Sequence, residues 1–252
     1  MERVVLCMKW GDLYSADYVN VLYHAVCANL KGPFRFVCLT DNAEGFCDGV
    51  EHFPIPEIGL SESHWKHGAW PKLSVFSADL YGLKGRALFI DMDTMITGPL
   101  DEMFEYPGSF VGIDTGENWK FSTTGNPPLL GTGIFAFELG AHADILKKFQ
   151  TDCDGFVERD VIEQVYVQNE IEEIEFWPLE WVHSFKYHLR HSLSVNLLIP
   201  PKRPASTTKI VAFHGDPRPI DLIKTKIWGV FPHIGRGPVQ WFKDYWSKYG
   251  GQ

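Results

Sequence analysis

Short apolar runs that alternate with segments of helical spacing constrain this 252-residue chain more than any other feature. Val4–Met8, Phe34–Leu39 and Arg86–Ile90 are runs of the length that is typical of buried strands. Between the first two lies Tyr18–Leu30, in which apolar residues recur at helical spacing. This alternation predicts an α/β fold in a single domain, residues 1–252, with a mostly parallel central sheet flanked by helices.

Later segments continue the alternation. Thr115–Leu130 is a Gly/Pro/Thr loop, long enough to predict a binding or lid role rather than a simple connection. We expect further strands at Glu51–Phe53, Phe110–Ile113, Ile134–Phe137, Ile174–Trp177, Val195–Ile199 and Ile210–Phe213, and further helices at Lys72–Leu83, Ala141–Phe149, Arg159–Glu170 and Val239–Lys248.

The charge balance excludes one class of partner. Lys and Arg total 23 against 32 Asp and Glu, which gives a net charge of −9. Non-specific nucleic-acid binding needs a basic face that neutralises phosphates, so we expect no nucleic-acid partner. The chain also contains 18 Phe, 9 Tyr and 9 Trp, which suit core packing as well as flat ligands such as bases and sugar faces.

The cysteines and the N-terminus bear on location. Five cysteines are an odd number without a CxxC pair, so we expect reduced thiols in a cytoplasmic protein. The apolar run after Met1-Glu2-Arg3 is too short for a signal peptide. No apolar run approaches the roughly 18 residues of a transmembrane helix. Peripheral contact is therefore the expected form of any membrane association.

Two carboxylates follow the clearest strand. Asp91 and Asp93 come directly after Ala87–Ile90, at the end of a strand where ligands collect in open α/β sheets. Residues i and i+2 of an extended chain point the same way, so these two can share a Mg²⁺ or Mn²⁺ ion. The alternative is a pair of solvated loop aspartates, which is how we interpret Asp152-Cys153-Asp154, because it follows a helix.

A second strand ends in a further metal ligand. His214 follows Ile210–Phe213, and Gly215 and Arg218 come shortly after it. The segment thus combines an imidazole, a flexible residue and a guanidinium group, whose N–H donors match phosphate oxygens. A lone histidine is more often an ordinary core or surface residue, and the residues alone leave both interpretations open.

Together these motifs resemble those of the nucleotide-sugar glycosyltransferases of the GT-A fold, in particular the glycogenin-like family 8 and related bacterial enzymes. The resemblance implies a Rossmann-type GT-A domain. Asp91-x-Asp93 matches their DxD motif, and His214-Gly215-x-Pro217-Arg218-Pro219 resembles their C-terminal motif. The resemblance implies a metal held by Asp91, Asp93 and His214. It also implies a diphosphate contacted by Gly215 and by Arg218, where the family has Lys.

The resemblance also implies a donor site. Trp70-Pro71-Lys72-Leu73 resembles a segment whose basic residue faces the donor, and Gly131-Thr132-Gly133 resembles a sugar-binding Asn-x-Gly segment that here lacks the Asn. Arg159-Asp160-Val161 resembles an Asp-Gln segment that meets the donor sugar, without its Gln, so Asp160 is a candidate catalytic residue. Residues 1–114 are the expected nucleotide-binding half, residues 115–252 the sugar and acceptor half. The expected nucleotide-binding residues at the ends of the first two strands are Lys9, Trp10, Tyr14, Thr40 and Asp41.

The resemblance implies transfer of a sugar, from a UDP-sugar in preference to other donors, to a hydroxyl of a glycan, a lipid-linked glycan or a protein. Asp91, Asp93 and Arg218 would support departure of the nucleoside diphosphate together with Mn²⁺ or Mg²⁺. Retention of configuration is expected. Inversion would need a carboxylate beside the acceptor, for which Asp114 and Asp160 are the candidates.

Two other functions remain open from sequence. Phosphatases resembling haloacid dehalogenases also carry Asp-x-Asp after an apolar strand, with the first Asp as nucleophile, here Asp91. Their pattern fits less well, because Met95 stands where Thr or Val is usual. A non-catalytic sugar- or nucleotide-binding module would use the aromatic residues without needing a metal set.

Overall fold

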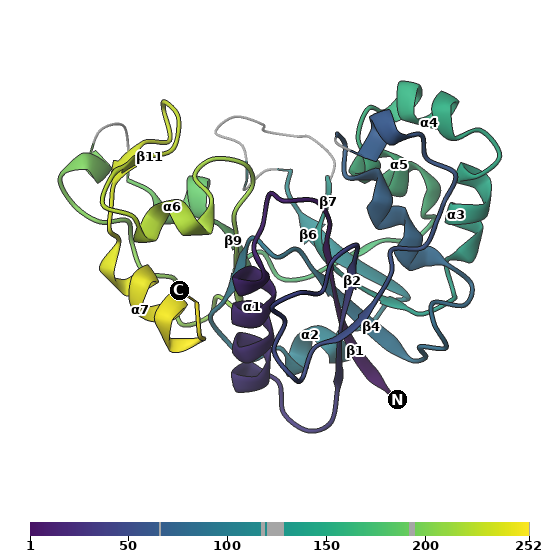
Figure 1. The fold of residues 1–252 in the computed structure, drawn as a ribbon, viewed down its shortest axis with the longest axis horizontal. Coiled ribbons are helices and arrows are strands. Elements are labelled where there is room, and N and C mark those ends of the chain that lie inside the picture. The colour runs from purple at the N-terminus through teal and green to yellow at the C-terminus, as the bar shows by residue number, and fades with distance from the viewer. Residues whose placement is uncertain (66, 117–118, 120–128, 192–194, 252) are drawn as a thin grey trace.

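The computed structural model describes residues 1–252 except 66, 117–118, 120–128, 192–194 and 252. Figure 1 shows a twisted sheet with α1 (Ala16–Asn29) and the C-terminal elements on one side and α3, α4 and α5 on the other. The α/β architecture with helices on both faces is therefore confirmed.

The first strand shows why its sequence is apolar throughout. In β1 (Arg3–Lys9), Val5 and Cys7 belong to the core that includes α1 and the C-terminal helix, whereas Leu6 and Met8 belong to the core on the opposite face. All four side chains are buried. Successive residues of a strand point to opposite faces, so a strand covered on both faces reads as a continuous apolar run.

The central sheet, over the residues described, has seven strands in the order β3-β2-β1-β4-β7-β6-β8. Neighbours among β3, β2, β1 and β4 are parallel, β7 is antiparallel to β4 and β6, and β8 is parallel to β6. The sheet is thus mostly parallel, and the carboxyl ends of β1, β2 and β4 share one edge. The bounds are β2 Arg35–Thr40, β3 Glu51–Phe53, β4 Arg86–Ile90, β6 Phe110–Asp114, β7 Leu130–Glu138 and β8 Glu175–Phe176.

A smaller sheet brings distant parts of the chain to that edge. β5 (Thr94–Ile96) begins directly after Asp93 and pairs with β10 (Ile210–Ala212), with Thr94 opposite Ala212. The amide of Phe213 donates to the carbonyl of Asp93 at 3.0 Å. Because of this pairing, the loop after β10 lies beside the loop after β4.

The remaining strands and helices lie outside the seven-stranded sheet. The smaller sheet is completed by β9 (Val182–Ser184), and a separate hairpin is formed by β11 (Ile227–Trp228) and β12 (Gly235–Arg236). The helices are α2 Asp101–Glu105, α3 Ala143–Phe149, α4 Cys153–Asp160, α5 Glu163–Glu170, α6 Pro219–Ile223 and α7 Gln240–Lys248, with shorter helical turns η1 Glu62–Trp65, η2 Trp70–Phe76, η3 Phe185–Leu189 and η4 Val195–Leu197.

One predicted helix is two helices. The expected helix Arg159–Glu170 is broken at Val161, whose φ is +67°, so that α4 ends at Asp160 and α5 begins at Glu163. Val161 and the residue after it are β-branched, which weakens helix propensity. The amide of Glu163 donates instead to the carbonyl of Gly68 at 2.8 Å, which joins the start of α5 to the loop before η2.

Two further predictions about elements were wrong. Val195–Ile199 is the turn η4 rather than a strand, and Leu198 is 88% exposed. Pro200 and Pro201 follow, and proline lacks the amide that a central strand needs. The expected helix Lys72–Leu83 is the tight turn η2, which begins at Trp70 and ends where Ser77 adopts an extended conformation.

The cysteines and helices bear on the expected location. None of the five cysteines is disulfide-bonded, and Cys7 and Cys38 are buried. Within the part of the chain that the structure describes, no helix has the length and apolar character needed to cross a membrane.

Candidate functional site

Two hollows meet at the carboxyl end of β4. The first, which we call the Thr132 hollow, has a volume of about 550 Å³ and includes Thr132, Glu163 and His214 in its lining. The second, the Trp10 hollow, has a volume of about 540 Å³ and includes Trp10. Both are lined by Ala69, Lys72, Asp91 and Asp93. The predicted Asp-x-Asp pair therefore lies at the junction of two spaces of ligand size.

Both the backbone amide and the carboxylate of Asp91 have partners in the protein. Its amide donates to the carbonyl of Gly133 at 2.8 Å, and Lys72 Nζ lies 3.0 Å from its Oδ1. The Lys72 side chain is 5% exposed and also donates to the carbonyl of Thr132 at 3.0 Å. Burial raises the pKa of Asp91, and the Lys72 ammonium opposes that rise.

Asp93 is the more perturbed carboxylate. Burial first, and then the charge of Asp91, raise its pKa to about 7, while a hydrogen bond from Tyr14 acts in the opposite direction. Tyr14 Oη donates to Asp93 Oδ2 at 2.9 Å. Burial and the neighbouring Asp93 raise the pKa of Tyr14 well above its usual range, so Tyr14 stays a neutral donor. The Arg218 guanidinium lies 6.0 Å from the centre of the Tyr14 ring.

His214 also lines the Thr132 hollow. Its ring stacks on those of Trp119 and Tyr187, with centroids 5.3 and 5.4 Å away, and its Nε2 lies 2.7 Å from Ser184 Oγ. Lys186 Nζ donates to its backbone carbonyl. Burial and then the charge of Lys186 lower its pKa to about 4, so the imidazole is neutral at physiological pH.

The candidate ligands for a divalent metal are Asp91, Asp93 and His214. Within the described residues, no three His, Cys, Asp or Glu side chains are already gathered around a metal position. Asp91, Asp93 and His214 nevertheless face the same hollow. Two carboxylates with raised pKa values are desolvated negative charges that a divalent cation would stabilise, and a neutral imidazole is a competent ligand. An Nε2–H donated to Ser184 would leave the lone pair on Nδ1. The residues present therefore fit Mg²⁺ or Mn²⁺.

The sequence prediction missed a pair on α5. Glu163 is 1% exposed and accepts a hydrogen bond from Thr132 Oγ1 at 2.8 Å, and Gln164 also lines the Thr132 hollow. Burial raises the pKa of Glu163 to about 7, against the charge of Lys72. Glu163 Oε1 is buried with no hydrogen-bond partner among the residues described. The sequence signal was an acid-amide pair, Glu163-Gln164, at the start of a helix, three residues after Asp160.

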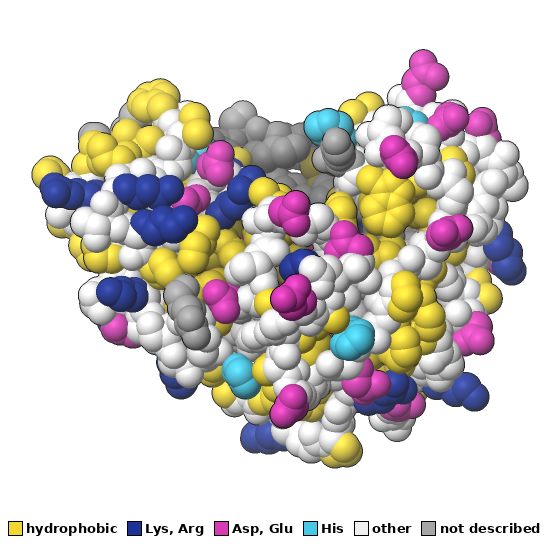
Figure 2. Space-filling view, in the orientation of Figure 1, with side chains coloured by type: hydrophobic (Ala, Val, Ile, Leu, Met, Phe, Trp, Pro, Cys, Tyr) yellow, Lys and Arg dark blue, Asp and Glu magenta, His cyan; other side chains and the backbone are white. Residues whose placement is uncertain are grey.

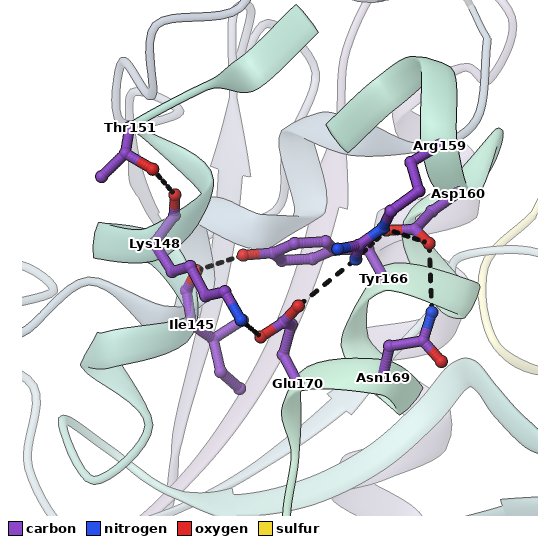
Figure 3. A network of polar contacts seen from close by, with 8 residues as sticks. All are labelled: Ile145, Lys148, Thr151, Arg159, Asp160, Tyr166, Asn169 and Glu170. Carbon is purple, nitrogen blue, oxygen red and sulfur yellow. Dashed lines mark hydrogen bonds and ion pairs between the residues drawn. The ribbon is translucent and has the colours of Figure 1, made fainter. Parts of the chain in front are cut away.

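Asp160, the candidate catalytic residue, belongs to a different network, which Figure 3 shows between α3, α4 and α5. Its carboxylate accepts from Arg159 Nε and from Asn169 Nδ2, both at 3.0 Å. Arg159 also lies 3.3 Å from Glu170, which pairs with Lys148 at 2.5 Å. Asp160 lines neither hollow, and these contacts join its carboxylate to residues of α4 and α5.

The expected nucleotide residues divide into two groups. Trp10, Tyr14 and Asp41 line the Trp10 hollow together with Trp65, and Trp10 Nε1 donates to the Trp65 carbonyl at 3.1 Å. Asp41 accepts from the amide of Gly11 at 2.8 Å. Gly215 lines the Thr132 hollow. The residues that line neither hollow, as the described part of the chain outlines them, are Lys9, Thr40 and Arg218.

Two other expectations are only partly visible. Most of the loop Thr115–Leu130, for which a lid role was predicted, lies outside the described residues. Asp114, the other candidate base for inversion, lines neither hollow in the described structure, and it accepts hydrogen bonds from the amides of Gly116 and Leu129 at 2.7 and 3.2 Å.

Comparison with known proteins adds to this geometry. No protein-family model matches the chain, and no curated protein sequence matches it. Among solved structures, the galactosyltransferase LgtC, in complex with donor and acceptor sugar analogs, is similar with a TM-score of 0.56 and 14% identity over 99% of this chain and 97% of LgtC. The chain thus has the GT-A fold, as the sequence motifs predicted.

Two further glycosyltransferase structures have the same fold. The bifunctional glycosyltransferase WbbM is similar with a TM-score of 0.62 and 12% identity over 99% of this chain and 50% of WbbM. The glycosyltransferase GlyE of Streptococcus pneumoniae is similar with a TM-score of 0.59 and 12% identity, over 99% of this chain and 62% of GlyE.

Proposed function

We propose that this chain is a metal-dependent glycosyltransferase that moves a sugar from a nucleoside diphosphate sugar to an acceptor hydroxyl. One observation carries the proposal: two hollows of similar volume join at Lys72, Asp91 and Asp93. A nucleotide sugar has a flat base at one end, a sugar at the other and a diphosphate between them. The two hollows and the charged junction match these three parts.

The Trp10 hollow suits the nucleoside. Trp10, Tyr14 and Trp65 give it an aromatic lining, on which a base can stack, and Asp41 supplies a carboxylate that can accept from base or ribose. The lining residues of this hollow all fall within residues 1–114, the half that was expected to bind nucleotide. We keep UDP as the proposed nucleotide on the strength of the sequence resemblance.

The Thr132 hollow suits the donor sugar and the acceptor. Thr132, Glu163 and Gln164 present a hydroxyl, a carboxyl and an amide, which match the donors and acceptors of sugar hydroxyls. An active-site Gln→Glu variant of LgtC is among the similar structures. Gln164 is the glutamine that lines this hollow, and we assign it a position beside the sugar.

The junction supplies stabilisation for the leaving group. When bound by Asp91, Asp93 and His214, Mn²⁺ or Mg²⁺ supplies Lewis-acid stabilisation of the diphosphate. Lys72 adds a buried positive charge beside Asp91, and Arg218 adds another beside Tyr14. Tyr14 orients Asp93 through its hydrogen bond.

We propose that the reaction retains the configuration of the sugar. The acids that line the Thr132 hollow are Asp91, Asp93 and Glu163. The first two are assigned to the metal, and Glu163 is buried and bonded to Thr132, so a carboxylate that could activate an acceptor is not evident among the described residues. The unpaired cysteines fit a cytoplasmic location, which we also keep as a proposal.

A ligand screen tests the function. Thermal unfolding is measured with nucleoside diphosphates and nucleotide sugars, with and without Mn²⁺, and then release of nucleoside diphosphate is followed for each donor that stabilises. A ligand at a hundred times its Kd adds about 2.7 kcal/mol to the free energy of unfolding. Stabilisation without turnover on any acceptor would favour a binding module, and trapping of Asp91 by a phosphate analogue would favour a phosphatase.

A further inference from the structure

Charge is divided unevenly along this chain. Residues 1–180 contain 12 Lys and Arg against 29 Asp and Glu, a net charge of −17, whereas residues 181–252 contain 11 against 3, a net charge of +8. In Figure 2, basic side chains gather over the part of the molecule that contains β11 and α6, and acidic side chains predominate on the opposite side. The overall charge of −9 therefore conceals a strongly basic C-terminal part.

The same part of the chain exposes large apolar side chains. Leu198 is 88% exposed, Phe231 68%, Ile227 65%, Val230 63% and Ile199 47%. β12 packs beside η4, and one hollow is lined by Leu197, Lys226, Ile227 and Arg236, so the two exposed segments adjoin. We call this surface the C-terminal basic face and define it by the exposed residues Leu198, Ile199, Lys202, Lys224, Lys226, Ile227, Val230, Phe231 and Arg236.

The hairpin β11–β12, which contributes to this face, packs on the rest of the protein through the buried side chain of Trp228. Trp228 is 1% exposed and its ring lies 5.7 Å from that of Phe185. Its neighbour Ile227 is paired with Arg236 across the hairpin, and both are exposed. Alternate residues of a strand point to opposite faces, so the buried Trp228 fixes an apolar and a basic side chain together on the outer face.

We propose that the C-terminal basic face binds the surface of an anionic lipid bilayer. Val230 and Phe231 enter the interface at the tip of the hairpin, while Lys224 and Arg236 contact lipid phosphates. The acidic remainder of the chain is repelled by the same surface, which orients the molecule with this face toward the membrane. The proposal does not depend on the sugar chemistry.

Charge and apolarity together favour this occupant over two others. A nucleic acid would satisfy the cations but offers no apolar phase to exposed Leu, Ile and Val side chains. A second copy joined through the same face would oppose two surfaces of the same positive charge. An anionic bilayer provides both the negative charge and the apolar phase.

Vesicle co-sedimentation of the full chain tests the proposal. We expect binding to vesicles of phosphatidylglycerol and phosphatidylcholine at low salt, little binding to phosphatidylcholine alone, and weaker binding in 0.5 M NaCl. The double change Lys224→Gln with Arg236→Gln should weaken binding about 25-fold, because each interfacial cation contributes about fivefold. The double change Val230→Ser with Phe231→Ser should weaken it at least about tenfold.

Matched controls lie on the acidic part of the chain. Lys84→Gln with Lys147→Gln removes two exposed cations, and Leu179→Ser removes an apolar side chain that is 48% exposed. Both controls should bind vesicles as the wild type does, and all variants should keep the wild-type Tm. The proposal is overturned if the wild type does not bind anionic vesicles or if the face variants bind as tightly as the controls. It is also overturned if the Val230/Phe231 change abolishes dimerisation or single-stranded RNA binding and leaves vesicle binding intact.

Discussion

Lys72 and Asp91 form an ion pair, 3.0 Å between Nζ and Oδ1, at the point where the Trp10 and Thr132 hollows meet. Burial by itself lowers the pKa of Lys72, but the charges of Asp91 and Glu163 outweigh burial, and the net result is a raised pKa. The ammonium is therefore charged at physiological pH. A fixed positive charge lies where a diphosphate would need one.

Replacing Lys72 should have a large effect on catalysis and a small effect on the free energy of unfolding. We expect Lys72→Ala to lower kcat/KM for sugar transfer about 100-fold or more, because leaving-group charge is no longer stabilised. Breaking a fully buried ion pair lowers the free energy of unfolding by about 3–5 kcal/mol. Because 34% of the Asp91 side chain is exposed to solvent, we expect Lys72→Ala to lower it by only roughly 1–2 kcal/mol. Lys84→Ala, at an exposed position, is the control for both readouts. Wild-type turnover in Lys72→Ala would remove Lys72 from the donor site.

The Tyr14 hydroxyl should matter for metal affinity. Tyr14→Phe removes the hydrogen bond to Asp93, which raises the pKa of that carboxyl further and leaves less carboxylate at pH 7. A hydrogen bond to a charged group contributes about 1.5–3 kcal/mol, so Mn²⁺ should bind about 10- to 100-fold more weakly. Isothermal titration with Mn²⁺ measures this directly. Tyr81→Phe, which removes an exposed hydroxyl that donates to the carbonyl of Pro54, should leave the affinity unchanged.

Glu163 should make stability depend on pH. Its pKa in the folded protein is about 7, against 4.5 ordinarily, so the unfolded chain releases this proton first. The stability that Glu163 contributes below about pH 4.5 is therefore lost as pH rises toward 7, by about 3 kcal/mol. Relative to wild type, Glu163→Gln should gain this amount between pH 4 and 8 in urea unfolding. Glu172→Gln, at an exposed acid, should follow the wild-type curve. Parallel curves for wild type and Glu163→Gln would show that Glu163 ionises normally.

Asp160 should contribute to folding rather than to chemistry. Asp160→Ala leaves Arg159 and Asn169 without their shared acceptor, so the free energy of unfolding should fall by about 1–3 kcal/mol. Because Asp160 lines neither hollow, kcat measured well below the Tm should stay within about threefold of wild type. A hundredfold loss of kcat in a fully folded Asp160→Ala variant would contradict this prediction and indicate that Asp160 acts in the active site.

The central part of the fold was predictable because each buried strand is apolar on both faces. β1, β2 and β4 were recognisable as short runs, and Asp91 and Asp93 were recognisable because they end one of them. The proximity of His214 was expected only by resemblance. Its physical cause is the pairing of β5 with β10, which depends on residues more than 100 positions apart.

The α4–α5 boundary was not predictable from spacing. A left-handed Val161 is rare for a β-branched residue, and what stabilises the break is the hydrogen bond from Glu163 to Gly68, a contact between distant segments. This break turns Glu163 and Gln164 toward the Thr132 hollow and leaves Asp160 among α3, α4 and α5. Asp160, the candidate chosen from the sequence, thus lies three residues before Glu163 and does not line the hollow.

The central claim is that Asp91 and Asp93 hold the metal that supports departure of the nucleoside diphosphate. Release of nucleoside diphosphate from the donor found in the ligand screen, measured with Mn²⁺ and with EDTA for wild type and Asp93→Ala, tests it most directly. The account predicts activity in the wild type only with the metal, and a loss on the order of a hundredfold or more in Asp93→Ala, since even residues behind the ligands contribute 10- to 100-fold. Full activity in EDTA, or full activity of Asp93→Ala, would contradict the account.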